Sequence, residues 1–330
     1  MRSLILFLLL LAELLVFALL SGESLGSFDE LAGYLTAKSL DLVPQLAPLL
    51  VLSVGMTLVL ITAGIDLSVG SQVALVACLM SCFPASGAFW LTAVPVGLLV
   101  AIGLGVFNGL LIARLDVPPI IATLGTMIFF RGLCSTIMQD RERSPFHDVP
   151  GFEWLGGFDG TLLVVALVAG AGGVLFGRSR WRRELLLLGG NRVAARYAGV
   201  PVDRRLIETY ALMGLLGFLA AVCFTARHGS VSASSLVGLE LKVIVAVVLG
   251  GTRVEGGRGS LVGSLLGVLL IGVMDQGLVE AKGWGDRHLP FEISHLRYVA
   301  LGGLLVLGVW LNTRAASWRI ERRPRAADRG

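Results

Sequence analysis

Charged side chains are scarce in this sequence. Asp, Glu, Lys and Arg make up 15% of its 330 residues, whereas a soluble domain contains about 25%. Long runs of Leu, Val, Ile, Ala and Gly take their place, and the mean hydropathy is +0.82. This composition excludes an ordinary soluble domain and indicates an all-α, polytopic membrane protein.

Lysine is almost absent, and its absence excludes one class of function. The only lysines are Lys38, Lys242 and Lys282, and none of them stands in a Gly-Lys-Ser or Gly-Lys-Thr sequence. The chain therefore lacks the usual loop that binds the phosphates of a nucleotide. We expect no nucleotide on this chain and no nucleic-acid partner.

Histidine and cysteine are also few, with four of each. The cysteines fall inside apolar runs, the histidines lie in or near loops, and neither type has the spacing of metal ligands. We find no paired carboxylates and no Ser/His/Asp constellation at membrane depth. The sequence therefore predicts neither an enzyme nor a metal or cofactor site.

Apolar runs long enough to cross a bilayer are the main feature that is present. The N-terminal run lacks a clean cleavage site and is longer than a signal-peptide core, so we expect it to be a retained first helix. The predictions are a single transmembrane domain over 1–330 and about ten spans. These spans are 4–20, 42–63, 67–83, 89–112, 119–138, 161–177, 206–225, 236–251, 260–279 and 297–312.

The charges between the runs predict the orientation. Segment 178–205 holds eight arginines against Glu184 and Asp203, and the tail 313–330 holds six against two acids. Segments 21–41 and 139–160 are acidic. Because basic loops stay in the cytoplasm and ten spans place both basic segments on one side, we expect both termini to be cytoplasmic.

A short helix is predicted within the basic segment 178–205. Asn191 is a good N-cap, Gly199 suits a left-handed closing position and Pro201 prevents continuation. The helix is too short to be stable alone. Its small apolar face, formed by Val193, Tyr197 and the alanines between and beside them, favours two contacts equally, either anionic lipid or a groove on a cytoplasmic partner.

A turn is predicted at Gly64-Ile-Asp-Leu-Ser-Val-Gly70. Asp66 can cap the following span by accepting backbone N–H groups from Ser68 or Val69, and Gly64 permits the tight reversal. Because an ionisable residue so close to the bilayer is also a functional candidate, a secondary role in the cytoplasmic surface or a gate remains open. The residues of this turn or gate are Gly64, Asp66, Ser68 and Gly70.

Small residues and isolated charges complete the candidates. Gly259, Gly263 and Gly267 recur at every fourth position and predict close helix packing, within the bundle or between two copies. Glu13 and Asp275 lie inside predicted spans, where a lone charge is costly. Arg131 and Arg297 are expected to neutralise them or to reach the membrane surface. For Asp275 the alternatives are a role specific to the substrate and a position facing a water-filled cavity, and we favour the cavity.

Four stretches of the chain form a specific combination of motifs. They are TLVLITAGIDLSVGS (Thr57–Ser71), VPPIIATLGTMIFFRGL (Val117–Leu133), GGNRVAARYAGV (Gly189–Val200) and AVVLGGTRVEGGRGSLVGSLLG (Ala246–Gly267). In sequence, order and spacing they resemble the permease subunits of bacterial sugar ABC importers of the ribose, xylose, galactose, rhamnose and autoinducer-2 type. The resemblance covers nearly all of 45–312 and implies a type II ABC importer permease fold in the bacterial inner membrane.

The resemblance also implies a function and partners. The chain would move a sugar or sugar-like solute inward, with ATP and Mg²⁺ on a separate ATP-binding subunit, beside a second identical or paralogous permease and below a periplasmic or extracellular sugar-binding protein. The loop 178–205 would couple the chain to the ATPase. The implied coupling residues are Gly189, Gly190, Asn191, Ala194, Ala195, Ala198 and Gly199.

An alternative function is a secondary transporter that works alone, driven by protons or sodium through Glu13 and Asp275. Ion-coupled sites usually group their ligands around broken helices, and these two acids are isolated in the sequence. The sequence therefore favours the ABC permease.

Overall fold

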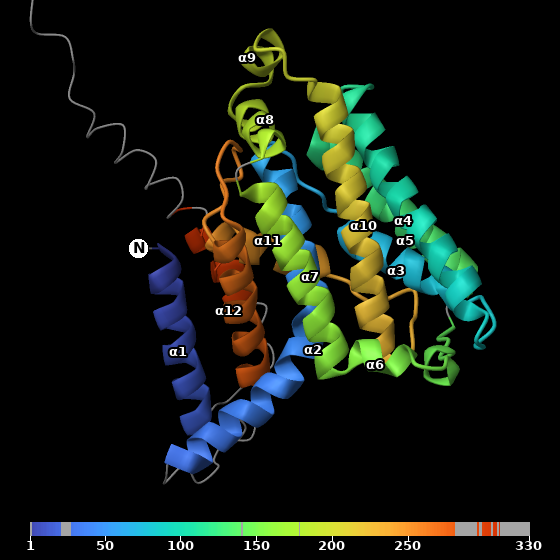
Figure 1. Ribbon diagram of the computed structural model, residues 1–330, viewed down its shortest axis with the longest axis vertical. Coiled ribbons are helices and arrows are strands. Elements are labelled where there is room, and N and C mark those ends of the chain that lie inside the picture. Colours follow the sequence, from blue (N-terminus) through green and yellow to red (C-terminus); the bar gives the residue numbers. More distant parts are fainter. Residues whose placement is uncertain are drawn as a thin grey trace, which may run out of the picture.

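The structure is a computed structural model that describes residues 2–20, 28–139, 141–177, 179–280, 296, 299–304, 306–308 and 310. The described residues are mostly helical, and an isolated bridge between Arg143 and Val231 is the one extended pairing among them. Figure 1 shows the arrangement. The helices are α1 (Arg2–Leu20), α2 (Phe28–Ile61), α3 (Val69–Met80), α4 (Phe89–Ala113), α5 (Pro119–Met138), a 3₁₀ turn (Phe146–Asp148), α6 (Phe152–Gly156), α7 (Phe158–Phe176), α8 (Arg180–Gly190), α9 (Arg192–Tyr197), α10 (Val202–His228), α11 (Leu239–Leu249) and α12 (Leu261–Glu280).

The prediction of ten spans is not confirmed. Helices occupy the first nine predicted positions and the described part of the tenth, but within the described residues only 6 helices are long and apolar enough to cross a membrane. Helix α3 has 12 residues and α11 has 11, so each is about 16 to 18 Å long, against a hydrocarbon core of about 30 Å. Arg297 and the tail 313–330 lie outside the described residues.

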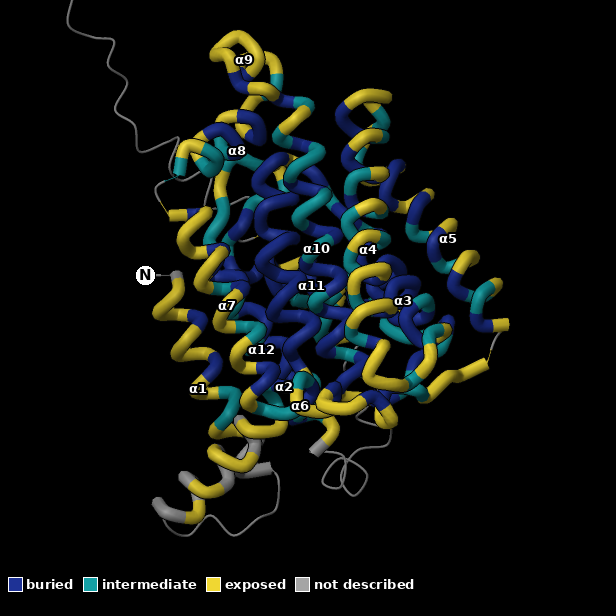
Figure 2. Tube along the Cα trace, turned by 45° about the vertical axis from the view of Figure 1, so that its right-hand side comes forward, coloured by how far each residue is buried: buried dark blue, intermediate teal, exposed yellow. Residues whose placement is uncertain are grey.

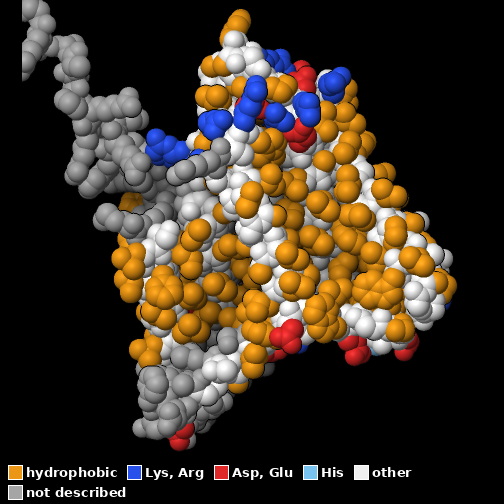
Figure 3. Space-filling model, viewed as in Figure 1, with side chains coloured by type: hydrophobic (Ala, Val, Ile, Leu, Met, Phe, Trp, Pro, Cys, Tyr) orange, Lys and Arg blue, Asp and Glu red, His pale blue; other side chains and the backbone are white. Residues whose placement is uncertain are grey.

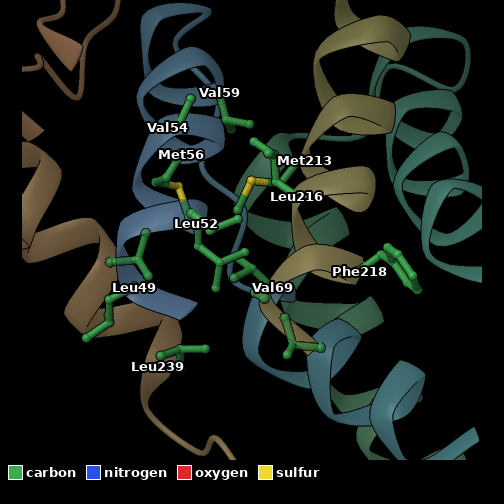
Figure 4. Close-up of a cluster of buried hydrophobic side chains, with 14 of the residues drawn as sticks. Leu49, Leu52, Val54, Met56, Val59, Val69, Met213, Leu216, Phe218 and Leu239 are labelled. Atoms are coloured by element: carbon green, nitrogen blue, oxygen red, sulfur yellow. The ribbon is translucent and has the colours of Figure 1, made fainter. Parts of the chain in front are cut away.

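Helices α2 and α10 form the centre of the bundle. In the apolar span of α2, 94% of the residues are buried, whereas in α7 at the periphery 22% are buried. Figure 2 shows this contrast. Figure 4 shows Met213 reaching from α10 toward α2, where a Cβ on Gly55 would lie 2.4 Å from the Met213 sulfur. Glycine at this position therefore allows the two central helices to approach closely.

Glycines also bring the outer helices against this centre. A Cβ on Gly105 of α4 would lie 2.2 Å from the Tyr210 carbonyl oxygen of α10. In the row predicted from the sequence, Cβ atoms on Gly263 and Gly267 would lie 2.0 and 2.1 Å from carbonyl oxygens of Gly250 and Ala246, and a Cβ on Gly259 would meet Ile61 at 2.6 Å. All three glycines thus pack within the chain.

The charged side chains gather at the two ends of the molecule. Lys and Arg, with a few acids, cover the end at which α8 and α9 lie, while the opposite end carries acidic side chains and the belt between them is hydrophobic (Figure 3). The exposed apolar side chains of this belt include Leu99, Ile128, Leu167 and Val174. This distribution suits a chain that is embedded in lipid and has different chemistry at its two surfaces.

Candidate functional site

Helix α8 begins the candidate site at the arginine-rich end. Its N-cap is Ser179, whose hydroxyl accepts a hydrogen bond from Arg182 N at 3.1 Å. Its last turn meets the end of α2 with no side chain between them, since a Cβ on Gly189 would lie 1.7 Å from the Ile61 carbonyl oxygen. Any larger residue at 189 would push α8 away from α2.

Arginine–carboxylate contacts join α8 to α10. The buried carboxylate of Glu184 accepts hydrogen bonds from Arg180 Nε at 2.7 Å and from Arg205 Nε of α10. Arg205 also donates to Glu208 at 2.6 Å, and Trp181 Nε1 of α8 donates to the same carboxylate at 3.0 Å. The hydrogen bond from Arg205 is the main cause that lowers the pKa of Glu184.

Helix α9 follows α8 and agrees with the local prediction. Asn191 Oδ1 accepts a hydrogen bond from Ala194 N at 2.9 Å, which confirms the predicted N-cap. Gly199 has φ +77°, the left-handed conformation expected for the closing residue. The helix spans Arg192–Tyr197, with Ala198 as its C-cap, so it is one residue shorter than the seven residues predicted from the sequence, Arg192–Ala198.

The predicted coupling residues divide into two groups. Ala195 is 1% exposed and Gly189 is buried, so both contact their own chain. Ala195 is thus turned toward its own chain and away from the exposed face of α9, and its role in coupling stays a prediction. The residues exposed at the surface are Gly190, Asn191, Ala194, Ala198 and Gly199.

The outward surface of α9 is apolar with a basic edge. Val193 is 64% exposed and Tyr197 is 91% exposed, and Arg196 pairs with Asp203 at the start of α10 at 2.9 Å. A cavity of about 140 Å³ lies between α9 and the adjacent ends of α4 and α10. Its lining residues are Ile112, Ala113, Asp116, Arg192, Val193, Arg196, Val202, Asp203 and Leu206.

The predicted turn at Gly64–Gly70 is a buried polar cluster. Asp66 Oδ1 accepts hydrogen bonds from Ser68 N at 2.9 Å and Ser68 Oγ at 2.6 Å, as expected. Ser68 Oγ accepts in turn from Gln72 at 2.7 Å and Asn108 at 2.8 Å. Asp66 is fully buried, so its carboxylate is not itself exposed at a surface, and its secondary role at the cytoplasmic surface or in a gate stays a prediction.

Glycines at both ends of this turn pack tightly against other elements. A Cβ on Gly64 would lie 2.7 Å from the Tyr210 hydroxyl of α10, and a Cβ on Gly70 would lie 2.4 Å from Glu240 Oε2. The turn therefore ties α2 and α3 to α10 and α11.

The isolated charges have other partners than the sequence suggested. Arg131 donates to the carbonyl oxygens of Ala233 and Ser235 at 2.6 and 2.8 Å, so it neutralises neither predicted acid. Asp275 pairs with Lys242 of α11, a partner that the sequence did not indicate. Glu13 retains one buried carboxylate oxygen without a partner in the described residues.

No group of three or more His, Cys, Asp or Glu side chains within the described part of the chain is arranged to hold a metal ion.

Comparison with known proteins gives a consistent family. Residues 40–309 match the family model described as the permease component of a branched-chain amino acid transport system. The ribose import permease protein of Bacillus subtilis is 37% identical over 244 residues, 72% of this chain and 76% of that protein. The autoinducer 2 import system permease protein of Yersinia enterocolitica is 30% identical and aligns with 97% of this chain and 89% of its own length.

A third relative and a solved structure extend the comparison. The fructose import permease protein of Bifidobacterium longum is 32% identical, and the alignment covers 80% of this chain and 81% of that protein. A solved ABC transporter structure in an inward-facing conformation has a TM-score of 0.51 and 18% identity, covers 93% of this chain and 98% of its own, and shares the fold. The chain therefore belongs to the branched-chain amino acid transport permease family and is a multi-pass permease subunit of an ABC import system.

Proposed function

We propose that this permease carries a monosaccharide or a sugar-like solute into the cytoplasm and draws its energy from ATP hydrolysed by a separate subunit. The named substrates of its relatives, which are ribose, fructose and autoinducer 2, support this class of solute. ATP and Mg²⁺ would bind to the ATPase, since the chain has no Gly-Lys-Ser or Gly-Lys-Thr sequence.

The exposed apolar surface of α9 carries the proposal that this helix docks into the ATPase. Val193 and Tyr197 are 64% and 91% exposed on a helix of 6 residues, and a helix this short needs a surface to hold it. The small side chains of Ala194 and Ala198 leave room for a close approach. Lipid headgroups are the competing contact.

The contacts behind α9 supply a route from docking to transport. Glu184 and Arg205 join α8 to α10, and α10 packs on α2, α3 and α4 in the centre of the bundle. A displacement of α9 by a closing ATPase would therefore move α10 as a connected body and change the packing along the solute path.

The wider arrangement follows from the same proposal. We place the basic end and both termini in the cytoplasm of a bacterial inner membrane, in a type II importer with about ten helices that enter or cross the bilayer. A second permease, identical or paralogous, would complete the path. A soluble sugar-binding protein would deliver the solute at the acidic end, where Glu153 and Trp154 are exposed.

Co-purification with the cognate ATPase tests the docking of α9. Ala194→Glu places a charge on the exposed face of α9, and we expect at least about a tenfold loss of ATPase association because a buried unpaired charge costs several kcal/mol. Ala88→Glu is the matched control. It introduces the same charge at an exposed alanine that immediately precedes the first residue of α4, at the end of the molecule opposite α9.

Equal association of the ATPase with wild type and Ala194→Glu would return α9 to the lipid surface. The alternative function, an ion-coupled transporter, predicts instead that the chain transports solute without any ATPase. The partner of Asp275 weakens this alternative, because pairing with Lys242 leaves that acid less free to bind an ion.

A further inference from the structure

An ion pair lies at membrane depth in the half of the molecule opposite α9. Lys242 Nζ of α11 donates to Asp275 Oδ2, and Asp275 belongs to the spanning part of α12, Leu261–Val279. The Lys242 and Asp275 side chains are 26% and 14% exposed. Asp275 Oδ1 is buried and has no hydrogen-bond partner among the described residues. One strong acceptor atom is thus left unused.

A cavity of about 220 Å³ opens beside this ion pair, which agrees with the expectation of a cavity at Asp275. Four elements and the segment before α11 enclose it, and Figure 4 shows two lining residues, Leu49 and Leu239, at the lower edge of the core cluster. The complete lining is Gln45, Leu46, Pro48, Leu49, Phe224, His228, Leu236, Val237, Leu239, Lys242, Gly272 and Asp275.

The ion pair is hard to explain as a source of stability. Taking both charges out of water costs several kcal/mol each, and an apolar pair of similar volume often stabilises a protein as well or better. Ionisable groups inside a spanning segment are for this reason functional candidates when they border a cavity. Lys242 and Asp275 meet this condition.

The lining points to a small neutral ligand that is rich in hydroxyl groups. Lys242 and Asp275 have no net charge together, so the cavity offers no net attraction to an ion. A hydroxyl can donate to Asp275 Oδ1 and accept from Lys242, while exposed Gln45 and His228 add polar groups that donate and accept. The ring of Phe224 stacks on His228 at 4.4 Å and gives an apolar face beside them.

The volume of the cavity suits a small ligand of this kind, a neutral molecule rich in hydroxyl groups. At about 220 Å³ it is smaller than the roughly 300 to 1,000 Å³ of pockets that enclose drug-sized molecules. It nevertheless corresponds to about seven water molecules at the volume of the liquid.

We propose that the cavity beside Lys242 and Asp275 is a binding site for a neutral polyhydroxy solute, with the free oxygen of Asp275 accepting a solute hydroxyl. This inference rests on the proposed function, because it places a station for the carried solute inside one permease subunit. Beyond that function, Lys242 and Asp275 would be residues that recognise the solute, in the half of the membrane opposite α9.

Ligand-observed NMR with D-ribose as the probe tests the site. The full-length permease in nanodiscs is compared with Asp275→Asn and with Val237→Trp, which narrows the cavity from an exposed lining position and keeps both residues of the ion pair. We expect each variant to weaken ribose binding by about tenfold or more, as for the loss of a hydrogen bond to a charged group. Asp41→Asn is the control, since Asp41 pairs with Arg227 and does not line the cavity.

A charge-swapped variant separates binding from folding. Lys242→Asp combined with Asp275→Lys keeps an ion pair but places the free carboxylate oxygen on α11 instead of α12. We therefore expect the double variant to be as thermally stable as wild type and to bind ribose as weakly as Asp275→Asn. Ribose binding that is absent from wild type, unchanged in Asp275→Asn and Val237→Trp, or restored by the swap overturns the inference. Cavity-dependent binding in a protein whose complete complex shows no ATP-driven uptake would instead refute the proposed function and leave the site intact.

Discussion

Glu184 is a buried carboxylate at the arginine-rich end, and its two oxygens are shared between Arg180 of its own helix and Arg205 of α10. Arg180 is 82% exposed and contributes little, whereas the Arg205 side chain is 16% exposed and much less screened by water. The contact with Arg205 is therefore the stronger of the two that Glu184 makes, and together with the hydrogen bond from Trp181 to Glu208 it joins α8 to α10.

This contact should weaken in acid. A carboxyl whose pKa is lowered by folding contributes stability that is present above its unfolded pKa, 4.5 for Glu184, and is lost as the pH falls through the folded pKa. We expect the amides of α8 to exchange faster, after correction for the intrinsic rate, when the pH is lowered below about 4.5. Hydrogen exchange followed by mass spectrometry measures this.

Glu184→Gln is the matched variant for the acid effect. It keeps the shape of the side chain and removes its titrating group, so faster exchange of α8 at neutral pH and a smaller acid response are expected, the remainder coming from Glu208, which accepts a hydrogen bond from Trp181. The same acid response in Glu184→Gln and wild type would show that another group controls α8.

Helix α8 ends in two adjacent glycines, Gly189 and Gly190, whose surroundings differ. A Cβ on Gly189 would lie 1.7 Å from a backbone oxygen of α2, while a Cβ on the adjacent Gly190 would meet nothing within 4 Å. Backbone cannot move aside as a flexible side chain can, so the two neighbouring positions should tolerate substitution very differently.

Gly189→Ala should displace α8 and lower both thermal stability and ATPase association, with a stability loss of about 1 to 3 kcal/mol, typical of overpacking. Gly190→Ala adds the same methyl group one residue later. It should leave both quantities close to those of wild type, and equal losses in the two variants would contradict the contact between α8 and α2.

Local elements were predictable here and contacts between distant segments were not. Asn191 and Gly199 lie at the two ends of α9, as predicted, because helix capping depends on residues that are close in the sequence. The pairing of Asp275 with Lys242, 33 residues away, leaves no mark in the sequence. The exposed apolar face of α9 was predicted, but the inward turn of Ala195 depends on how the helix lies against its own chain.

The predicted spans at α3 and α11 are not confirmed, for a related reason. Hydropathy counts apolar residues and ignores whether the backbone stays helical, and these runs are shortened by the turn before Val69 and the loop before Leu239. The shortened backbone is satisfied within the protein instead, as in Thr123 Oγ1 donating to the Ile65 carbonyl at 3.0 Å.

At the scale of the whole molecule, the separation of charge in Figure 3 predicts which end faces the cytoplasm. Tyr197 marks the arginine-rich end and is 91% exposed. The exposed Cys82 lies in the connection between α3 and α4, near the opposite end, and serves as a native marker.

Labelling of intact spheroplasts with a membrane-impermeant maleimide tests this orientation. We expect wild type to be labelled at Cys82, and the cysteine of Tyr197→Cys in a Cys82→Ala background to react only after permeabilisation. Labelling of Tyr197→Cys from outside would reverse the orientation and place α9 away from any ATPase.

If α9 transmits the ATPase cycle to the solute path, a substitution on its exposed face must slow transport. The decisive measurement is the initial rate of D-ribose uptake into proteoliposomes that contain the permease, its ATPase and its binding protein. We expect uptake that requires ATP, falls by about tenfold or more in Ala194→Glu, and is preserved in Ala88→Glu with the binding protein in excess. Uptake that proceeds without ATP, or at the wild-type rate in Ala194→Glu, would show that α9 does not couple the ATPase to transport.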